Sequence, residues 1–140
     1  MKRLGSILGL AGGLVMIASS GAHSILGWKG LSEALRAALA PADLIEALSF
    51  GWHFGGIAML AFGVIVIASF WKRMRGSPVS MFAPTVVGVT YVVFGAGALV
   101  ASKDPFFTIF VAPGILVLAG CAMKKGDTPN FSRRGHSSSE

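Results

Sequence analysis

The sequence has little charge and almost no cysteine. Only 13% of its 140 residues are Asp, Glu, Lys or Arg, where a typical soluble domain has roughly 25%. A soluble fold of this size would therefore have too little polar surface. The single cysteine, Cys121, excludes an internal disulfide, a CxxC redox pair and a thiolate zinc site.

Apolar residues are abundant instead and are gathered in long runs. They make up 54% of the chain, and the mean hydropathy is +0.72. Each run is long enough to cross a bilayer, which takes about 20 residues. We therefore predict an all-α polytopic membrane protein, a four-transmembrane-helix bundle with helices at about 4–28, 44–71, 82–101 and 105–123. The lipid bilayer is then its main partner.

The first apolar run has two interpretations. Ser20-Gly21-Ala22 offers small residues at the spacing of a signal-peptidase site, so residues 1–22 could be a cleaved signal peptide. The apolar character continues past this point to Trp28, however, and the run is longer than a usual signal core. We expect the segment to be retained as the first helix.

The interval between the first two runs, Lys29 to Asp43, is polar but patterned. Leu31, Leu35 and Leu39 share one helical face, which predicts a short amphipathic helix resting on the membrane surface. Pro41 would end this helix. Asp43 is expected to cap the next one.

The second run has a tryptophan near each predicted interface. Trp52 and Trp71 are 19 residues apart, and a helix of that length spans about 29 Å, which matches the hydrocarbon thickness. They are expected to lie in the two aromatic belts. In the later helices, Pro84 falls in a first turn, and Asp104 is expected to cap the last helix.

Glycines recur on single faces of the predicted helices. Small residues let two helices approach closely inside a membrane, so these faces predict helix–helix contacts, within one chain or in a homo-oligomer or larger membrane complex. Tyr91 lies on one such face near mid-bilayer and should have a hydrogen-bond partner there. The predicted packing residues are Gly5, Gly9, Gly12, Gly51, Gly55, Gly88 and Gly95.

Lysine and arginine are distributed unequally between the two ends of the predicted helices. Nine lie on the side of the N-terminus and three on the other, which predicts a cell-membrane protein with four crossings and both termini cytoplasmic. This placement explains the net charge of +6 better than a nucleic-acid partner does. We expect residues 1–125 to form the transmembrane domain and residues 126–140 a disordered cytoplasmic tail.

Two histidines lie near the same predicted interface, His23 before Trp28 and His53 after Trp52. The plainer interpretation is that each imidazole keeps its polar tip in water or bonds a backbone carbonyl. The alternative is axial ligation of a b-type haem, or a metal site that Glu46 would complete. No catalytic residue is indicated, and otherwise no cofactor is expected.

The segments 22–28 and 51–55, with these histidines and tryptophans, resemble uncharacterised small bacterial four-helix membrane proteins. The resemblance covers helices one and two and implies the fold but no activity. Small multidrug transporters share the length and the four crossings, but they have a glutamate in the first helix that this chain lacks. We therefore expect a structural or accessory membrane protein; the alternatives are a histidine-ligated haem or metal protein and a small-molecule carrier.

Overall fold

The computed structural model describes residues 2–123, and every regular element in that range is a helix. Four helical segments are long and apolar enough to cross a membrane: Arg3–Ala37, Ala42–Met74, Phe82–Ser102 and Pro105–Ala122. The predicted all-α fold with four such segments is therefore confirmed. The predicted tail, residues 126–140, and the third histidine, His136, lie outside the described residues.

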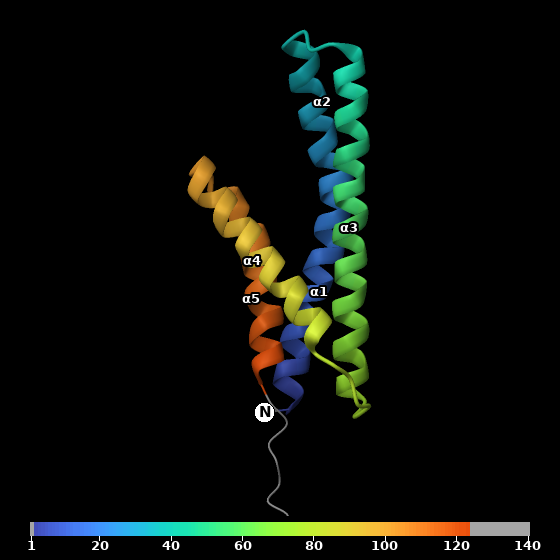
Figure 1. Cartoon of the computed structure of the whole chain (residues 1–140), viewed down its shortest axis with the longest axis vertical. Coiled ribbons are helices and arrows are strands. Elements are labelled where there is room, and N and C mark those ends of the chain that lie inside the picture. The colour runs from blue at the N-terminus through green and yellow to red at the C-terminus, as the bar shows by residue number, and fades with distance from the viewer. Residues whose placement is uncertain (1, 124–140) are drawn as a thin grey trace, which may run out of the picture.

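The first segment is longer than predicted. Helix α1 (Lys2–Ala22) passes through one π-helical turn (His23–Gly27) directly into α2 (Trp28–Ala37), as Figure 1 shows. The predicted short helix after Lys29 is therefore present, but it extends α1 instead of forming a separate element. It ends at Ala37, four residues before Pro41, and Leu39 beyond it adopts a left-handed conformation with φ of 56°.

Helix α3 (Ala42–Met74) runs back antiparallel to α1 and α2. Its 33 residues make it about 50 Å long. The predicted cap by Asp43 is wrong, because Pro41 occupies the N-cap position and no side chain caps the helix. Asp43 lies in the first turn, where its negative charge still suits the positive end of the helix dipole.

Helices α4 (Phe82–Ser102) and α5 (Thr108–Ala122) form a second, shorter hairpin. Pro84 lies in the first turn of α4, as predicted. A 3-10 turn (Pro105–Phe107) precedes α5, and Asp104 caps it as predicted, because its Oδ1 accepts a hydrogen bond from the Phe106 N–H at 2.9 Å.

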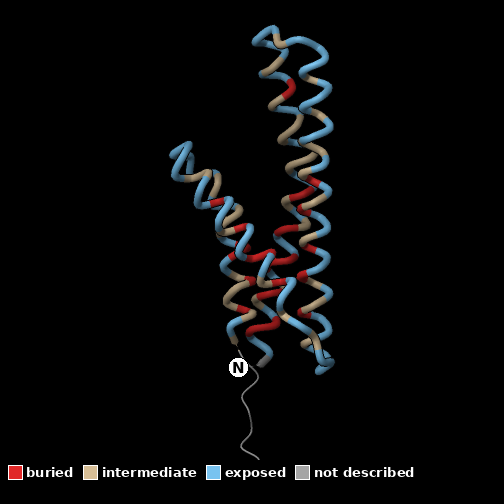
Figure 2. The backbone as a smooth tube through the Cα atoms, in the orientation of Figure 1, coloured by how far each residue is buried: buried red, intermediate tan, exposed pale blue. Residues whose placement is uncertain are grey.

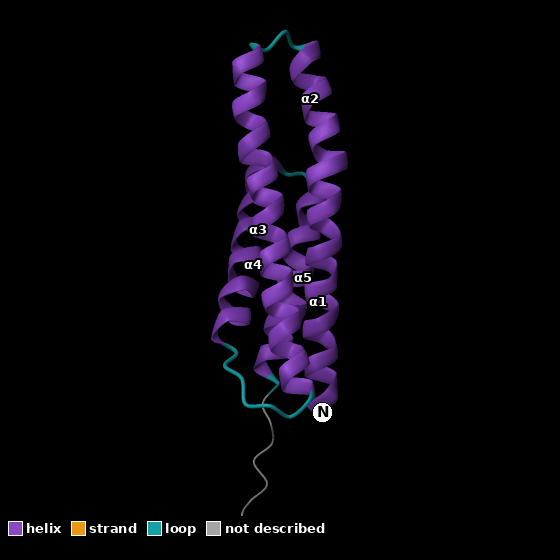
Figure 3. Cartoon of the chain, turned by 90° about the vertical axis from the view of Figure 1, so that its right-hand side faces the viewer, coloured by secondary structure: helices purple, strands orange, loops and turns teal. Residues whose placement is uncertain are grey.

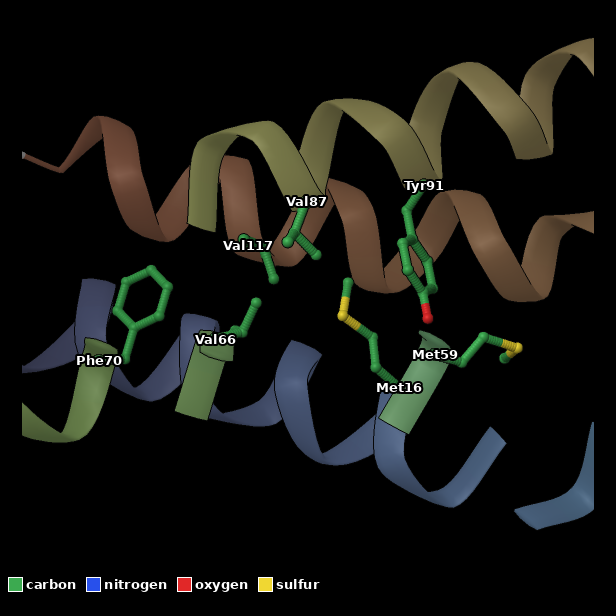
Figure 4. Close-up of a cluster of buried hydrophobic side chains, with 7 residues drawn as sticks. All are labelled: Met16, Met59, Val66, Phe70, Val87, Tyr91 and Val117. Atoms are coloured by element: carbon green, nitrogen blue, oxygen red, sulfur yellow. The ribbon is translucent and has the colours of Figure 1, made fainter. Parts of the chain in front are cut away.

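The two hairpins meet along α1, which packs against α3 on one side and α5 on the other. We call the half of the molecule that contains Lys2, Met74, Phe82 and Ala122 the basal half, and the opposite half the distal half. The hairpins lie side by side in the basal half and diverge in the distal half (Figures 1 and 3). Buried residues are accordingly concentrated where the hairpins meet (Figure 2). The core consists of Met16, Met59, Val66, Phe70, Val87, Tyr91 and Val117 (Figure 4).

Candidate functional site

The π-helical turn places His23 against Trp52 of α3. Their rings are stacked, with centroids 4.3 Å apart and planes inclined by 5°. The Trp52 indole N–H donates to the His23 carbonyl oxygen at 2.8 Å, and the His23 Nε2 lies 3.2 Å from the Trp52 carbonyl oxygen. These reciprocal hydrogen bonds and the ring contact join α3 to the end of α1.

His53 lies in the same group of rings but has different partners. Its Nδ1 is 2.8 Å from the Ser49 carbonyl oxygen, one turn earlier in α3, and its ring lies edge-on to Trp28 at 5.7 Å. A carbonyl only accepts, so the hydrogen-bonded nitrogen of each histidine carries a proton. We call His23, Trp28, Trp52 and His53 the histidine–tryptophan cluster. It corresponds to the plainer interpretation of the two histidines.

The predicted three-ligand metal site is not formed. Among residues 2–123, no three His, Cys, Asp or Glu side chains lie close enough together to hold a metal ion. Glu46 is exposed and lies seven residues before His53, a rise of about 10 Å along the helix, so the two side chains are at different levels. Ligation by His23 and His53 alone stays a prediction.

Five of the predicted packing glycines lie at close contacts between helices. A Cβ at Gly9 would lie 2.3 Å from the Phe70 ring, and one at Gly12 would lie 2.9 Å from the Pro113 carbonyl oxygen. A Cβ would likewise lie 2.9 Å from Met123 at Gly5, 2.9 Å from Leu118 at Gly88 and 2.8 Å from Val111 at Gly95. At these positions only a hydrogen atom fits, so the glycines set the distance between the helices.

Gly51 has no packing contact within residues 2–123 and Gly55 has a weak one, so a contact of this face with another chain stays a prediction. Gly51 is exposed, and a Cβ there would meet no atom within 4 Å. Gly55 is half-buried and faces only the His23 Nε2, at 3.5 Å.

The buried stripe of α3 was not predicted from the sequence. Gly56 lies against Ser24, whose Oγ would be 1.9 Å from an added Cβ, and Gly63 lies against Ile17. The signal was present in the spacing, because the buried residues alternate at intervals of three and four, which is one face of a helix. They are Gly56, Met59, Gly63, Val66 and Phe70.

Arg73 is a second residue whose role the sequence analysis missed. Its guanidinium donates to the carbonyl oxygens of Gly120, at 2.8 Å, and of Met123. These carbonyls belong to the last turn of α5, where the helix leaves acceptors without partners and where a cation suits the dipole. Arg73 therefore joins α3 to the end of α5, besides contributing to the charge asymmetry.

Tyr91 lacks the hydrogen-bond partner that was predicted for it. Its side chain is 4% exposed, and within residues 2–123 its hydroxyl oxygen is the one buried side-chain polar atom without a partner. The surrounding residues explain this, because the ring lies among the apolar side chains of the core, with Phe62 and Phe110 at 6.4 and 6.0 Å. Tyr91 also lines a cavity between the two hairpins.

No known family model, curated protein or solved structure matches this chain, so the resemblance drawn from the histidine-containing segments remains a prediction.

Proposed function

We propose that the chain is a multi-pass integral membrane protein of structural or accessory type. The observation that carries this proposal is the apolar outer surface of the four long helices. Ile57, Val64 and Val93 are 64%, 52% and 66% exposed, and many other large apolar side chains are exposed around them. A surface of this kind is stable against lipid and costly in water.

The charged residues favour one orientation in the membrane. Arg3, Lys72 and Arg75 lie in the basal half, together with Arg73. The positive-inside rule then puts the basal half, with the N-terminus, at the cytoplasmic face. With Trp71 and Trp52 at the two interfaces, α2 and the first ten residues of α3 extend about 15 Å beyond the outer interface.

An accessory role is supported by this projecting hairpin. It has exposed apolar side chains beyond the level of Trp52, among them Leu39 and Phe50, which are 90% and 72% exposed. Such side chains favour contact with another surface, either a second copy of this chain or another membrane protein. The hairpin would present that surface, and the basal half would hold it in the membrane.

Histidine ligation of a haem or a metal ion is the alternative function. In its favour, each histidine has one ring nitrogen fixed by a backbone carbonyl, which is how metal-binding imidazoles are often oriented. Against it, the His23 ring is stacked on Trp52, and the one free nitrogen of each ring would have to meet a shared ion. An absorbance spectrum of the purified protein separates the two: we expect no haem band, and a Soret band lost on His23→Ala would favour ligation.

Single-cysteine labelling in intact cells tests the proposed membrane topology. In a Cys121→Ser background, Ala34→Cys places a thiol on the exposed surface of α2, and Ser77→Cys places a matched thiol in the exposed loop between α3 and α4. A membrane-impermeant maleimide should label Ala34→Cys in intact cells and Ser77→Cys only after permeabilisation. Labelling of both in intact cells would contradict the proposal.

A further inference from the structure

A cavity of about 210 Å³ lies between the two hairpins, where they begin to diverge. An apolar cavity of about 150 Å³ is known to hold a benzene molecule, so this one has room for a single six-membered ring with small substituents. A tetrapyrrole, which contains four rings, exceeds it. The volume therefore favours a small cyclic molecule over a haem.

The walls of the cavity suit a flat and largely apolar molecule. Three phenylalanine rings line it, from α3, α4 and α5, and two small residues of α3 leave space beside them. The lining residues are His23, Gly55, Ala58, Met59, Phe62, Thr90, Tyr91, Phe94 and Phe110. The aromatic rings can pack face-on or edge-on against a bound ring.

Among the described residues, one hydrogen-bond donor without a partner lies beside the cavity, the Tyr91 hydroxyl, which Met59 separates from the open space. The Thr90 hydroxyl already donates to the Val86 carbonyl oxygen at 2.9 Å, and the His23 Nε2 is paired with the Trp52 carbonyl. The Tyr91 hydroxyl has no partner within residues 2–123. Figure 4 shows it directed from α4 toward α1 and α3, beside Met16 and Met59. Met59 is also part of the cavity wall, and an unbranched methionine adjusts easily to a new neighbour.

We propose that this cavity binds a lipid-soluble ring compound that carries a carbonyl oxygen, the chemistry of the headgroup of a membrane quinone. The carbonyl accepts the hydrogen bond of Tyr91, which relieves the cost of a buried hydroxyl without a partner. The phenylalanines enclose the ring, and an apolar tail leaves toward the lipid between the diverging hairpins. The proposal goes beyond the structural role and requires only that the chain is embedded in a membrane.

Two other occupants would fill the space differently. A lipid acyl chain fits the apolar walls but offers nothing to the Tyr91 hydroxyl. A water molecule satisfies the hydroxyl but leaves the aromatic walls without a partner, and a stable buried water needs two or more polar groups. A ring with a carbonyl matches both features at once.

The test uses the full-length protein in phospholipid nanodiscs and decylubiquinone as the probe. Quinones quench tryptophan fluorescence, and Trp52 is stacked on His23 at the cavity wall, so binding is followed as saturable quenching. Decylbenzene, which has the same tail and no carbonyl, serves as a competitor. We expect it to compete at least fivefold more weakly than the quinone, which is roughly the contribution of one hydrogen bond.

Two substitutions isolate the hydroxyl. Tyr91→Phe should raise the Kd for decylubiquinone by roughly fivefold and leave the competition by decylbenzene unchanged. It should fold normally, because the hydroxyl it removes has no partner within residues 2–123. Thr90→Val is the matched control: it also removes a hydroxyl from the cavity wall, but one that is already bonded to Val86, so the Kd should stay the same.

Four results would overturn the proposal. Quenching without saturation would mean that the quinone only dissolves in the lipid. Equal quinone affinity of the native protein and Tyr91→Phe, or equal competition by decylbenzene, would mean that the cavity accepts any acyl-like chain. Equal losses in Tyr91→Phe and Thr90→Val would mean that shape alone matters. None of these results would alter the labelling pattern of Ala34→Cys and Ser77→Cys, so the membrane topology is tested independently.

Discussion

The basal and distal halves of the molecule are held together by different contacts. In the basal half α1 lies so close to α3 and α5 that the Gly9 and Gly12 positions have no room for a side chain. Arg73 adds hydrogen bonds between α3 and the end of α5. In the distal half the contact with α3 combines large rings with glycines: His23 is stacked on Trp52, Gly27 lies against Trp52, and Gly56 lies against Ser24.

This difference shows that a glycine pattern permits close packing but does not cause it. Gly9 and Gly51 are both glycines inside helices and flanked by large apolar residues, yet Gly9 is buried against Phe70 and Gly51 is exposed. What separates them is the side of the helix on which each lies. Gly9 faces Phe70 of α3, whereas a Cβ at Gly51 would meet no atom within 4 Å, although the adjacent Trp52 contacts His23.

Substitution of Gly9 and Gly51 should give the largest difference in stability between the basal and distal halves. Gly9→Leu should lower the free energy of unfolding by about 3 kcal/mol, because the new side chain displaces the Phe70 ring. Gly51→Leu is the matched control and should leave stability unchanged or raise it by less than about 1 kcal/mol, since leucine is the better helix former. Unfolding of each purified variant in a mixed detergent series measures both.

Equal effects of the two substitutions would contradict the distinction between the halves. If Gly9→Leu retained full stability, the basal face of α1 would be in contact with lipid. If Gly51→Leu lost as much, the distal face would be covered by a second copy of the chain, and the loss would then depend on protein concentration.

A double-mutant cycle should measure a smaller effect, the coupling free energy between side chains of the histidine–tryptophan cluster in the distal half. His23→Ala and Trp52→Ala should be coupled by about 1 kcal/mol, because both remove the same ring stack, whereas each hydrogen bond goes to a backbone carbonyl that the other substitution keeps. His23→Ala and His53→Ala should be coupled by less than about 0.5 kcal/mol, since each histidine has its own tryptophan and carbonyl. Stronger coupling between the two histidines would indicate a shared ligand instead.

Much of the fold was predictable from local sequence. The four apolar runs, Pro84 in a first turn and the cap by Asp104 follow from composition and backbone chemistry at single positions. The short helix expected after Lys29 is not a separate element, because the composition changes there while the helical backbone continues through the π-helical turn. The cap expected at Asp43 failed because Pro41 starts the helix earlier.

The candidate site depended on contacts that no local pattern specifies. That both histidines lie near tryptophans was visible in the sequence, but the stacking of His23 on Trp52 depends on how α1 and α3 are aligned. The surroundings of Tyr91 were likewise only partly predictable from the sequence. Its position on a small-residue face was clear, whereas the cavity beside it exists because two hairpins diverge, which depends on packing over the whole length of α1.

Cysteine cross-linking in native membranes tests the central claim, that the hairpins adjoin in the basal half and diverge in the distal half. A Cβ at Gly12 would lie 3.3 Å from the Leu116 Cβ, close to the separation of about 3.5–4.5 Å in a disulfide. Continuing this antiparallel register along α1 brings Ala22 level with Phe106, and both are exposed. A cysteine at Gly12 must displace the Pro113 carbonyl, 2.9 Å from its Cβ, by a few tenths of an ångström, and the disulfide offsets this crowding. In a Cys121→Ser background, we predict that Gly12→Cys with Leu116→Cys forms a disulfide on mild oxidation, and that Ala22→Cys with Phe106→Cys does not. Equally efficient cross-linking of both pairs would contradict the account.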